Sequence, residues 1–350
     1  GLGDVYKRQL WCQAPKVTVP ECVWFRSLEG SRRGGCTVAG DTVWRPDALS
    51  VFFDPMNRTF VTGLATALLM PLLISACRAG TPPAAEAPVQ YPAANLQNDT
   101  YQPGPGWQLV WADEFEDESL DPGKWRRQVV EAGRFNREWQ RYTDSIDNAY
   151  IDNGSLVIKA IHESDRHGPD QFTSARLHTL PEDGWTYGKI VARIQLPYGR
   201  GIWPAFWMLG ANIDENGGDT PWPRSGEIDI LEMYGSRDNA VVEANIHYAG
   251  RSGRHANMGA VGARLDRGKF ADNFHVFEIE WDADQIQWFV DGKRFASTSI
   301  SSSEFSEFHK PFFILLNIAV GGSSAGRSDD TTPFPQYMYV DWVRVYQRNN

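Results

Sequence analysis

The sequence predicts an all-β protein, with a β-sandwich of the jelly-roll kind in a single domain over residues 105–348. Many short segments alternate apolar and polar residues or are rich in β-branched and aromatic residues, and helical periodicity is nearly absent. Turns that bear Gly and Pro separate these segments. The chain of 350 residues is 42% hydrophobic and 13% aromatic, which is enough to bury a substantial core.

The expected strands follow one another beyond residue 105. They are Ser155 to Ile161, Lys189 to Leu196, Val241 to Tyr248, His275 to Trp281 and Tyr337 to Tyr346. Between two further strand-like runs, the segment QIQWFVDGKRFAS carries Asp291 and Gly292, a dipeptide that strongly indicates a two-residue β-hairpin. The pattern of short strands and tight turns favours one sandwich over several small domains.

The charge of the chain excludes some partners. Its formal net charge is -10, and no cluster of Lys and Arg stands out, so we expect no nucleic-acid partner. A neutral substrate fits this charge better. The 14 Trp residues suit a large core, and their faces also suit stacking against the apolar faces of sugar rings.

The N-terminal part of the chain is different in character. Residues 1–55 show no sustained hydrophobic periodicity and hold three of the four cysteines, and we interpret them as an artefactual or misassigned extension upstream of Met56. Beyond Cys77 the chain has no cysteine, so no disulfide or cysteine metal site is possible there. Residues 78–104 are rich in Pro and Ala and are typical of a flexible tether.

The segment 56–77 has the layout of a signal peptide, with one positive charge, a short apolar run and small residues before a cysteine. Its end, Ile74 to Cys77, resembles the lipobox of bacterial lipoproteins, in which the cysteine becomes the lipidated N-terminus. We therefore expect an exported lipoprotein of the outer membrane, cell surface or periplasm, which contacts the membrane only through a lipid at Cys77. The alternative is a short buried apolar helix, which the Pro-rich stretch that follows disfavours.

Three carboxylates lie close together in the segment GEIDILEM. Side chains alternate along a strand, so Glu227 and Asp229 share a face. Glu232 joins them only if a β-bulge at Ile230 and Leu231 shifts the phase by one residue. Three acids on one face repel one another, and a solvent-facing acidic strand is the alternative to a reactive site.

Two such carboxyl groups roughly 5 to 5.5 Å apart are what retaining glycoside hydrolysis requires, one ionised and one protonated. Neighbouring carboxylates raise the pKa of the acid and help to keep it protonated. Upstream, Trp203 and Trp207 in GIWPAFWMLG could build a floor for sugar rings. Downstream, His247 shares a strand face with Asn245 and Glu243 and is a second-line site residue.

These residues resemble family 16 of the glycoside hydrolases, and most closely its laminarinase-like endo-β-1,3-glucanases. The motifs that carry the resemblance are WADEF, NREWQRYT, SLVIKA, FTSARLHT, YGKIVARIQLP, GIWPAFWMLG, GEIDILEM, NIHYAG, FILLNIAVGG and YVDWVRVY, in the order of the family over residues 111–346. Two residues separate Asp229 from Glu232, and this bulged form resembles laminarinases, agarases and carrageenases more than lichenases.

The resemblance implies a concanavalin-like jelly roll with a cleft on its concave sheet, retaining endo-hydrolysis, and no catalytic cofactor. It places the nucleophile at Glu227, its assistant at Asp229 and the general acid and base at Glu232. The substrate-binding positions that it implies are Asn136, Arg176, Trp203, Trp207 and His247. It also implies a possible structural calcium ion away from the cleft, at Glu114, Gly154 and Asp341.

A neutral β-1,3-glucan, with or without mixed 1,3 and 1,4 linkages, is the substrate that we expect, and we expect a monomer. Three alternatives stay open. The same scaffold could hydrolyse a galactan such as agarose or carrageenan, it could transfer the glycosyl group to another sugar, or it could bind glycans without cutting them.

Overall fold

The computed structural model describes residues 25–26, 32–33, 100–163 and 171–349, and the chain separates into two units at Ala79. In the first unit the described residues are β1 (Phe25–Arg26) and β2 (Arg32–Arg33), which pair antiparallel. The predicted signal peptide over 56–77, the lipidation site Cys77 and most of the tether lie outside the described residues. Within the described part of the chain, no helix is both long and apolar enough to cross a membrane.

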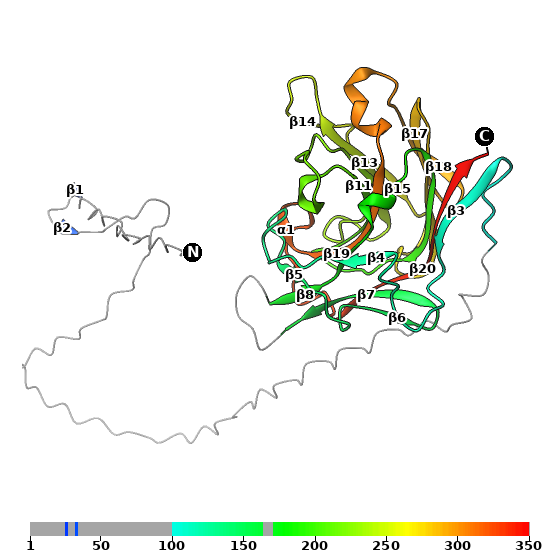
Figure 1. The fold of residues 1–350 in the computed structure, drawn as a ribbon. Coiled ribbons are helices and arrows are strands. Elements are labelled where there is room, and N and C mark those ends of the chain that lie inside the picture. The colour runs from blue at the N-terminus through cyan, green and yellow to red at the C-terminus, as the bar shows by residue number, and fades with distance from the viewer. Residues whose placement is uncertain (1–24, 27–31, 34–99, 164–170, 350) are drawn as a thin grey trace, which may run out of the picture. The chain divides into compact units, whose positions relative to one another are not determined.

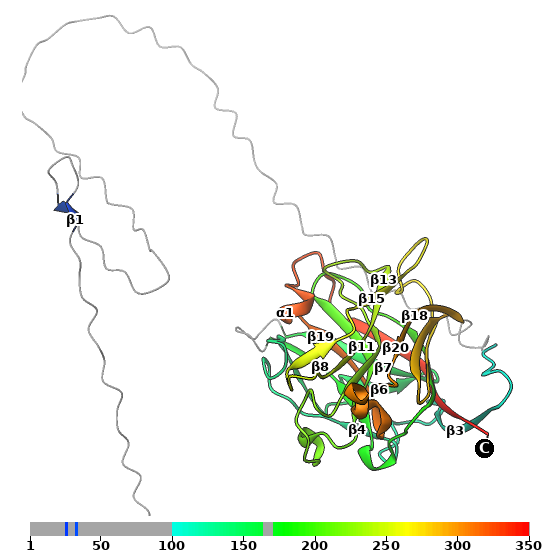
Figure 2. The same cartoon turned by 90° about the horizontal axis from the view of Figure 1, so that it is seen from above.

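The second unit consists of two β-sheets (Figures 1 and 2). The ten-stranded sheet contains β3 (Trp107–Asp113), β5 (Gln140–Tyr142), β6 (Ala149–Asp152), β7 (Ser155–His162), β8 (Phe172–Ser174), β10 (Gly188–Gln195), β16 (His275–Trp281), β17 (Gln285–Val290), β18 (Lys293–Ser299) and β20 (Gln336–Arg348). The eight-stranded sheet contains β4 (Trp125–Arg127), β9 (Arg176–Thr179), β11 (Ile202–Gly210), β12 (Glu227–Glu232), β13 (Val241–Ala249), β14 (His255–Asn257), β15 (Val261–Arg264) and β19 (Phe312–Val320). Among the described residues of this unit, helical structure is confined to α1 (Gly322–Ala325) and 3-10 turns at Pro181–Asp183, Asp214–Asn216 and Ser303–His309.

The strand order is that of a sandwich with long-range pairing. The ten-stranded sheet runs β18-β17-β16-β10-β20-β7-β8-β5, with β3 beside β20 and β6 beside β7. The eight-stranded sheet runs β14-β13-β12-β11-β19-β9-β4, with β15 beside β13. Each pair is antiparallel except β5 with β8. The predicted all-β sandwich is confirmed, and the five predicted strands correspond to β7, β10, β13, β16 and β20.

The predicted hairpin is also confirmed. Asp291 and Gly292 connect β17 to β18 and have φ values of 49° and 73°. Two consecutive residues with positive φ are what a type I′ turn requires, and Asp followed by Gly tolerates them at low cost.

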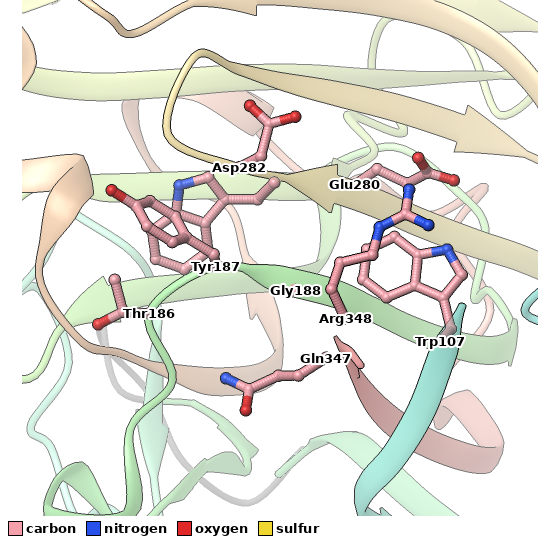
Figure 3. A pocket seen from close by; sticks show the side chains of 9 residues that line it. Trp107, Thr186, Tyr187, Gly188, Glu280, Asp282, Gln347 and Arg348 are labelled. Carbon is pink, nitrogen blue, oxygen red and sulfur yellow. The ribbon is translucent and has the colours of Figure 1, made fainter. Parts of the chain in front are cut away.

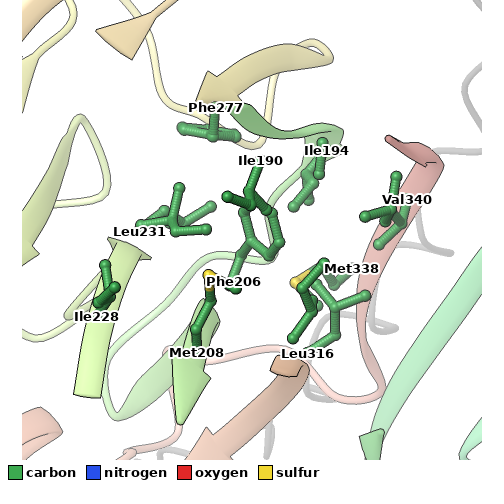
Figure 4. Close-up of a cluster of buried hydrophobic side chains, with 14 of the residues drawn as sticks. Ile190, Ile194, Phe206, Met208, Ile228, Leu231, Phe277, Leu316, Met338 and Val340 are labelled. Carbon is green, nitrogen blue, oxygen red and sulfur yellow. The ribbon is translucent and has the colours of Figure 1, made fainter. Parts of the chain in front are cut away.

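The core lies between the two sheets, and Figure 4 shows side chains from both of them pointing toward one another. Ile190 and Val340 come from the ten-stranded sheet, and Phe206, Ile228 and Leu316 come from the eight-stranded sheet. All five side chains are fully buried, and each contributes roughly 1.5 to 3 kcal/mol through removal of its surface from water. Because side chains alternate, the neighbours of these core residues on the eight-stranded sheet point away from the core.

Candidate active site

Strand β12 contains the bulge that the sequence predicts. Against β11, Leu231 pairs with Phe206 and Asp229 pairs with Trp207, so Ile230 is the extra residue. The pairing with β13 shifts between Asp229 and Glu232 as well. The bulge returns Glu232 to the face from which regular alternation would remove it.

The pairing with β13 shows that the three acids share one face. Glu227, Asp229 and Glu232 stand opposite His247, Asn245 and Glu243, which alternate on one side of that strand. The two sets form a polar surface on the side of the eight-stranded sheet away from the core.

A row of directly opposed residues crosses this surface. Arg176 on β9 pairs with Asn317 on β19, Asn317 with Ala205 on β11, Ala205 with Glu232, and Glu232 with Glu243 on β13. Paired residues on adjacent strands lie on the same face, about 4.5 to 5.5 Å apart. The small side chain of Ala205 leaves room beside the carboxylate of Glu232.

Both carboxylate oxygens of Glu232 accept a hydrogen bond. Trp203 Nε1 donates to Oε1 over 2.8 Å, and Tyr234 OH donates to Oε2 over 2.8 Å. The rings of Trp203 and Tyr234 pack against each other with centroids 5.2 Å apart. These contacts hold the carboxylate in one orientation.

Glu227 and Asp229 are held from the other side. Trp222 Nε1 donates to Glu227 Oε2 over 2.9 Å. His247 Nε2 lies 3.2 Å from Asp229 Oδ2 and 3.8 Å from Glu227 Oε1. The backbone carbonyl of Asp229 accepts a 2.8 Å hydrogen bond from Trp288 Nε1, which ties the bulged strand to the core.

Burial of the acids changes their proton affinity. Burial raises the pKa of Glu227 to about 8, assisted by the charges of Asp229 and Glu232, whereas His247 and the hydrogen bond from Trp222 act in the opposite direction. Burial also raises the pKa of Asp229 well above its usual range, and it raises the pKa of Glu232. The cluster therefore retains protons near neutral pH, as a site that must supply a general acid requires.

A second polar network lies along the same surface. Trp207 Nε1 donates to Asn317 Oδ1 over 2.7 Å, and Asn317 Nδ2 donates to Tyr142 OH over 3.2 Å. Tyr142 OH and Asn136 Nδ2 each donate to Glu138, both over 3.1 Å. Burial raises the pKa of Glu138. The network brings two of the predicted substrate-binding residues, Asn136 and Trp207, into one chain of contacts.

Arg176 joins this network through its guanidinium group. It forms a 2.8 Å ion pair with Glu215, and its guanidinium carbon lies 4.7 Å from the ring centroid of Trp207 and 4.6 Å from that of Phe135. A cation between two aromatic rings is a rigid arrangement. The predicted substrate-binding residues thus fall into two groups on one face, with Trp203 and His247 beside the acids and the other three along the network.

Comparison with known proteins identifies the family. The family model described as "Glycosyl hydrolases family 16" matches residues 134–344. The chain belongs to this family. It is 39% identical to a beta-glucanase of Rhodothermus marinus over 267 residues, which cover 72% of this chain and 89% of the relative. It is 33% identical to the glucan endo-1,3-beta-glucosidase A1 of Niallia circulans, where the match covers 69% of this chain and 38% of the relative.

Solved structures agree with this membership. The laminarinase catalytic domain from Thermotoga maritima MSB8 superposes with a TM-score of 0.60 and 42% identity, and the match covers 70% of this chain and 99% of that domain. The protein is accordingly a glycoside hydrolase with a jelly-roll fold. The carboxylate surface on β12 is its candidate active site.

Two of the three residues predicted to bind calcium pair with arginines in the structure. The carboxylate of Glu114 accepts two hydrogen bonds of 2.7 Å from Arg344, and Asp341 pairs with Arg193 over 2.6 Å. Gly154 lies in the turn between β6 and β7 with φ of 75°. Each carboxylate pairs with an arginine, and a Ca²⁺ ion here would draw on backbone carbonyl oxygens as well as on these side chains. Bound calcium stays an untested prediction.

Sequence reasoning missed several residues that contact the acids or extend the network. They are Glu138, Trp222, Tyr234, His255 and Asn317. Asn317 carried a signal, because it is the one polar residue in the apolar run FFILLNIAV. Trp222 carried no such signal in the sequence, since it stands between two prolines in a loop outside any strand. In the structure 44% of its surface is exposed.

A cavity of about 340 Å³ lies at the ends of β3, β10, β16 and β20 (Figure 3). None of the predicted site residues lines it. Three of its polar side chains already have partners: Glu280 pairs with Lys189 over 2.9 Å, Arg348 lies over the ring of Trp107, and Tyr187 OH contacts His309 Nδ1 at 2.8 Å. The family chemistry therefore belongs to β12 and not to this cavity.

Proposed function

We propose that this glycoside hydrolase cleaves β-1,3-glucans of the laminarin type within the chain and retains the anomeric configuration. The observation that carries the proposal is the bulge in β12, which places Glu227 and Glu232 on one face with Asp229 between them. The names of the relatives, beta-glucanase and glucan endo-1,3-beta-glucosidase, support the substrate class.

The proposed reaction uses the two glutamates in turn. The carboxylate of Glu227 attacks the anomeric carbon and forms a covalent ester, while the glycosidic C–O bond breaks and Glu232 gives its proton to the departing sugar oxygen. Glu232, now ionised, then takes a proton from water, and the resulting hydroxyl attacks the anomeric carbon and releases Glu227. Electrons and protons balance over the two steps, and no cofactor enters.

The contacts of each glutamate support these roles. The hydrogen bond from Trp222 and a protonated His247 both favour the ionised form of Glu227, which attack requires, but burial outweighs them and raises its pKa to about 8. Burial raises the pKa of Glu232, as a proton donor requires, and Trp203 and Tyr234 hold its two oxygens in place.

The surface around the acids supports a neutral substrate over a sulfated galactan. Glu138 adds a further carboxylate to the network, and Arg176 and Arg237 are already paired with Glu215 and Glu243. A sulfated polymer would need uncompensated cations there. The ring of Trp207, which is partly exposed, offers an apolar face to a glucose unit. Mixed β-1,3/1,4-glucan fits the same surface, and transfer to another sugar would use the same intermediate.

The test offers the protein laminarin, lichenan, agarose and carrageenan and measures new reducing ends. We expect laminarin to give the fastest release and product sizing to show a rapid fall in chain length, the mark of internal cleavage. Products longer than the substrate would indicate transfer. No release from laminarin or lichenan would overturn the proposal.

A second experiment separates the roles of the glutamates. With an aryl β-glucoside of a reactive phenol, Glu227→Ala in the presence of azide should yield the α-glycosyl azide, because azide enters where the nucleophile stood. Glu232→Ala should yield the β-azide through the covalent intermediate. Glu278→Gln, which alters a buried glutamate in the other sheet, should behave as the unmodified protein. The opposite pairing of products would exchange the two roles.

We also propose that the enzyme is exported and anchored to a membrane through a lipid at Cys77. Cys77→Ala should abolish the incorporation of labelled palmitate and release the protein from the membrane fraction. Palmitate in that variant would contradict the assignment of Cys77.

A further inference from the structure

Three side chains at the site form a set that matches a transition-metal ion. One ligand atom from each of Glu227, Asp229 and His247 lies within 4.8 Å of the other two. Around Zn²⁺, ligand atoms at about 2.0 to 2.2 Å in tetrahedral geometry are separated by about 3.3 to 3.5 Å. The separation of His247 Nε2 from Asp229 Oδ2 is 3.2 Å and from Glu227 Oε1 is 3.8 Å, and both distances are close to this spacing.

A buried carboxylate oxygen in this set has no hydrogen-bond donor. Oδ2 of Asp229 accepts no hydrogen bond within the described residues, and the residue is only 2% exposed. A buried acceptor without a donor costs about 1 to 3 kcal/mol, and more when it is charged. A cation bound at this oxygen would remove that cost.

His247 is arranged as a metal ligand commonly is. Asn245 Nδ2 lies 3.2 Å from Nε2, and an amide that donates there requires the proton of the neutral ring to sit on Nδ1. A metal ion would take the place of that amide hydrogen at the single lone pair of Nε2. Nδ1 in turn lies 2.7 Å from His255 Nε2, and the two rings stack with centroids 5.0 Å apart. A ligand histidine that donates its second N–H to a neighbour is fixed in tautomer and orientation.

The set is also open on one side. The side chains of His247 and Glu227 are 18% and 17% exposed, so an ion can reach them from the face on which the polysaccharide binds. Three protein ligands and one open position are the pattern of an accessible zinc site.

We propose that Glu227, Asp229 and His247 bind a divalent transition-metal ion of the zinc class and that the bound ion excludes the polysaccharide. The ion occupies the nucleophile, so hydrolysis stops while it is bound and resumes when a chelator removes it. The imidazole ligand favours zinc, nickel or copper over magnesium and calcium, which prefer oxygen ligands. The inhibition rests on the proposed function, whereas the binding does not.

The test measures binding of zinc chloride to the full chain by equilibrium dialysis, without substrate. Every sample has its four cysteines alkylated, because they lie in the first 77 residues and would take zinc themselves. The unmodified protein should bind one zinc ion per chain at the site. His247→Ala and the isosteric Asp229→Asn should each weaken binding at least tenfold.

His275→Gln is the matched control. His275 also pairs with an acid, Asp291, at 2.7 Å, but it lies on the ten-stranded sheet, so its loss should leave zinc binding unchanged. Circular dichroism confirms that each variant folds. Equal zinc binding by the unmodified protein and Asp229→Asn, or no saturable binding at all, would overturn the proposal.

Competition is measured with Glu232→Gln, which keeps all three ligands and prevents hydrolysis. Excess β-1,3-gluco-oligosaccharide should displace zinc from it, and magnesium chloride at the same concentration should not. Zinc that stays bound beside the oligosaccharide would overturn the exclusion. A protein that binds zinc in the expected pattern but hydrolyses no glucan would refute the proposed function and leave the metal site standing.

Discussion

Strands β12 and β16 carry nearly the same acidic pattern in very different surroundings. Glu227 and Asp229 alternate with Ile228 on β12, and Glu278 and Glu280 alternate with Ile279 on β16. On β16, Lys189 Nζ lies 2.9 Å from a carboxylate oxygen of each glutamate. On β12, no Lys or Arg among the described residues forms an ion pair with the three acids.

The difference separates structural acids from reactive ones. The pair on β16 is neutralised by a buried lysine, and Glu278 also accepts a 2.6 Å hydrogen bond from Tyr101. The acids on β12 have a histidine, two indole N–H groups and one phenol as partners, which orient them without cancelling their charge. Buried carboxylates kept without a compensating cation are costly and typical of reactive sites.

The largest expected effect is on kcat, and it is measured with two single variants that each remove one acid, from β12 or from β16. Glu227→Gln keeps the shape of the side chain but cannot attack carbon, so we expect kcat on laminarin to fall on the order of 10⁴-fold or more, about 5 kcal/mol of activation free energy. Glu278→Gln should change kcat by less than about twofold. Reducing-sugar assays on both variants make the comparison, and comparable losses would remove the distinction between the strands.

The second effect is on stability. Lys189→Met leaves Glu278 buried without its cation, and breaking a buried pair in this way costs about 3 to 5 kcal/mol. Urea unfolding followed by tryptophan fluorescence measures the loss, and the folded fraction should retain its kcat. A variant as stable as the parent would show that Lys189 does not neutralise the acids of β16.

The sequence alone was sufficient to predict the β-sandwich and the shared face of the three acids on β12. Alternation located the strands, and the two residues between Asp229 and Glu232 required a bulge, because a polar residue cannot share the core face with Ile228. It could not reveal Trp222 or His255, since Trp222 lies in a loop and His255 on a three-residue edge strand, where no periodic pattern shows which way a side chain points. Nor could it separate β12 from β16, because the cation that neutralises Glu278 comes from β10, which is distant in sequence.

The third effect is a pH dependence of stability that belongs to β12. The pKa of Glu227 is raised from its ordinary 4.5 to about 8, so between these values the folded protein holds a proton that the unfolded chain has lost. The free energy of unfolding therefore falls as pH rises through this window. The stability that comes from the raised pKa of Glu227 is fully present only below pH 4.5 and is lost as pH rises to about 8.

Glu227→Gln lacks this proton and should not lose stability in that window. We expect its stability relative to the parent to rise by about 3.5 kcal/mol between pH 5 and pH 8, as measured by urea unfolding at both values. A difference that stays constant with pH would show that Glu227 titrates normally.

The smallest effect tests the contacts that orient Glu232. Burial and the charge of Glu232 raise the pKa of Tyr234, so its phenol stays an O–H donor across the working range. Its hydrogen bond lowers the pKa of Glu232 against the larger effect of burial. Tyr234→Phe removes this bond, worth about 1 kcal/mol, and should move the alkaline limb of the kcat profile upward by less than about one pH unit. Tyr187→Phe, which removes a phenol hydrogen bond far from the acids, should leave the limb in place. A limb that moves downward would mean that Glu232 is not the acid whose titration limits turnover.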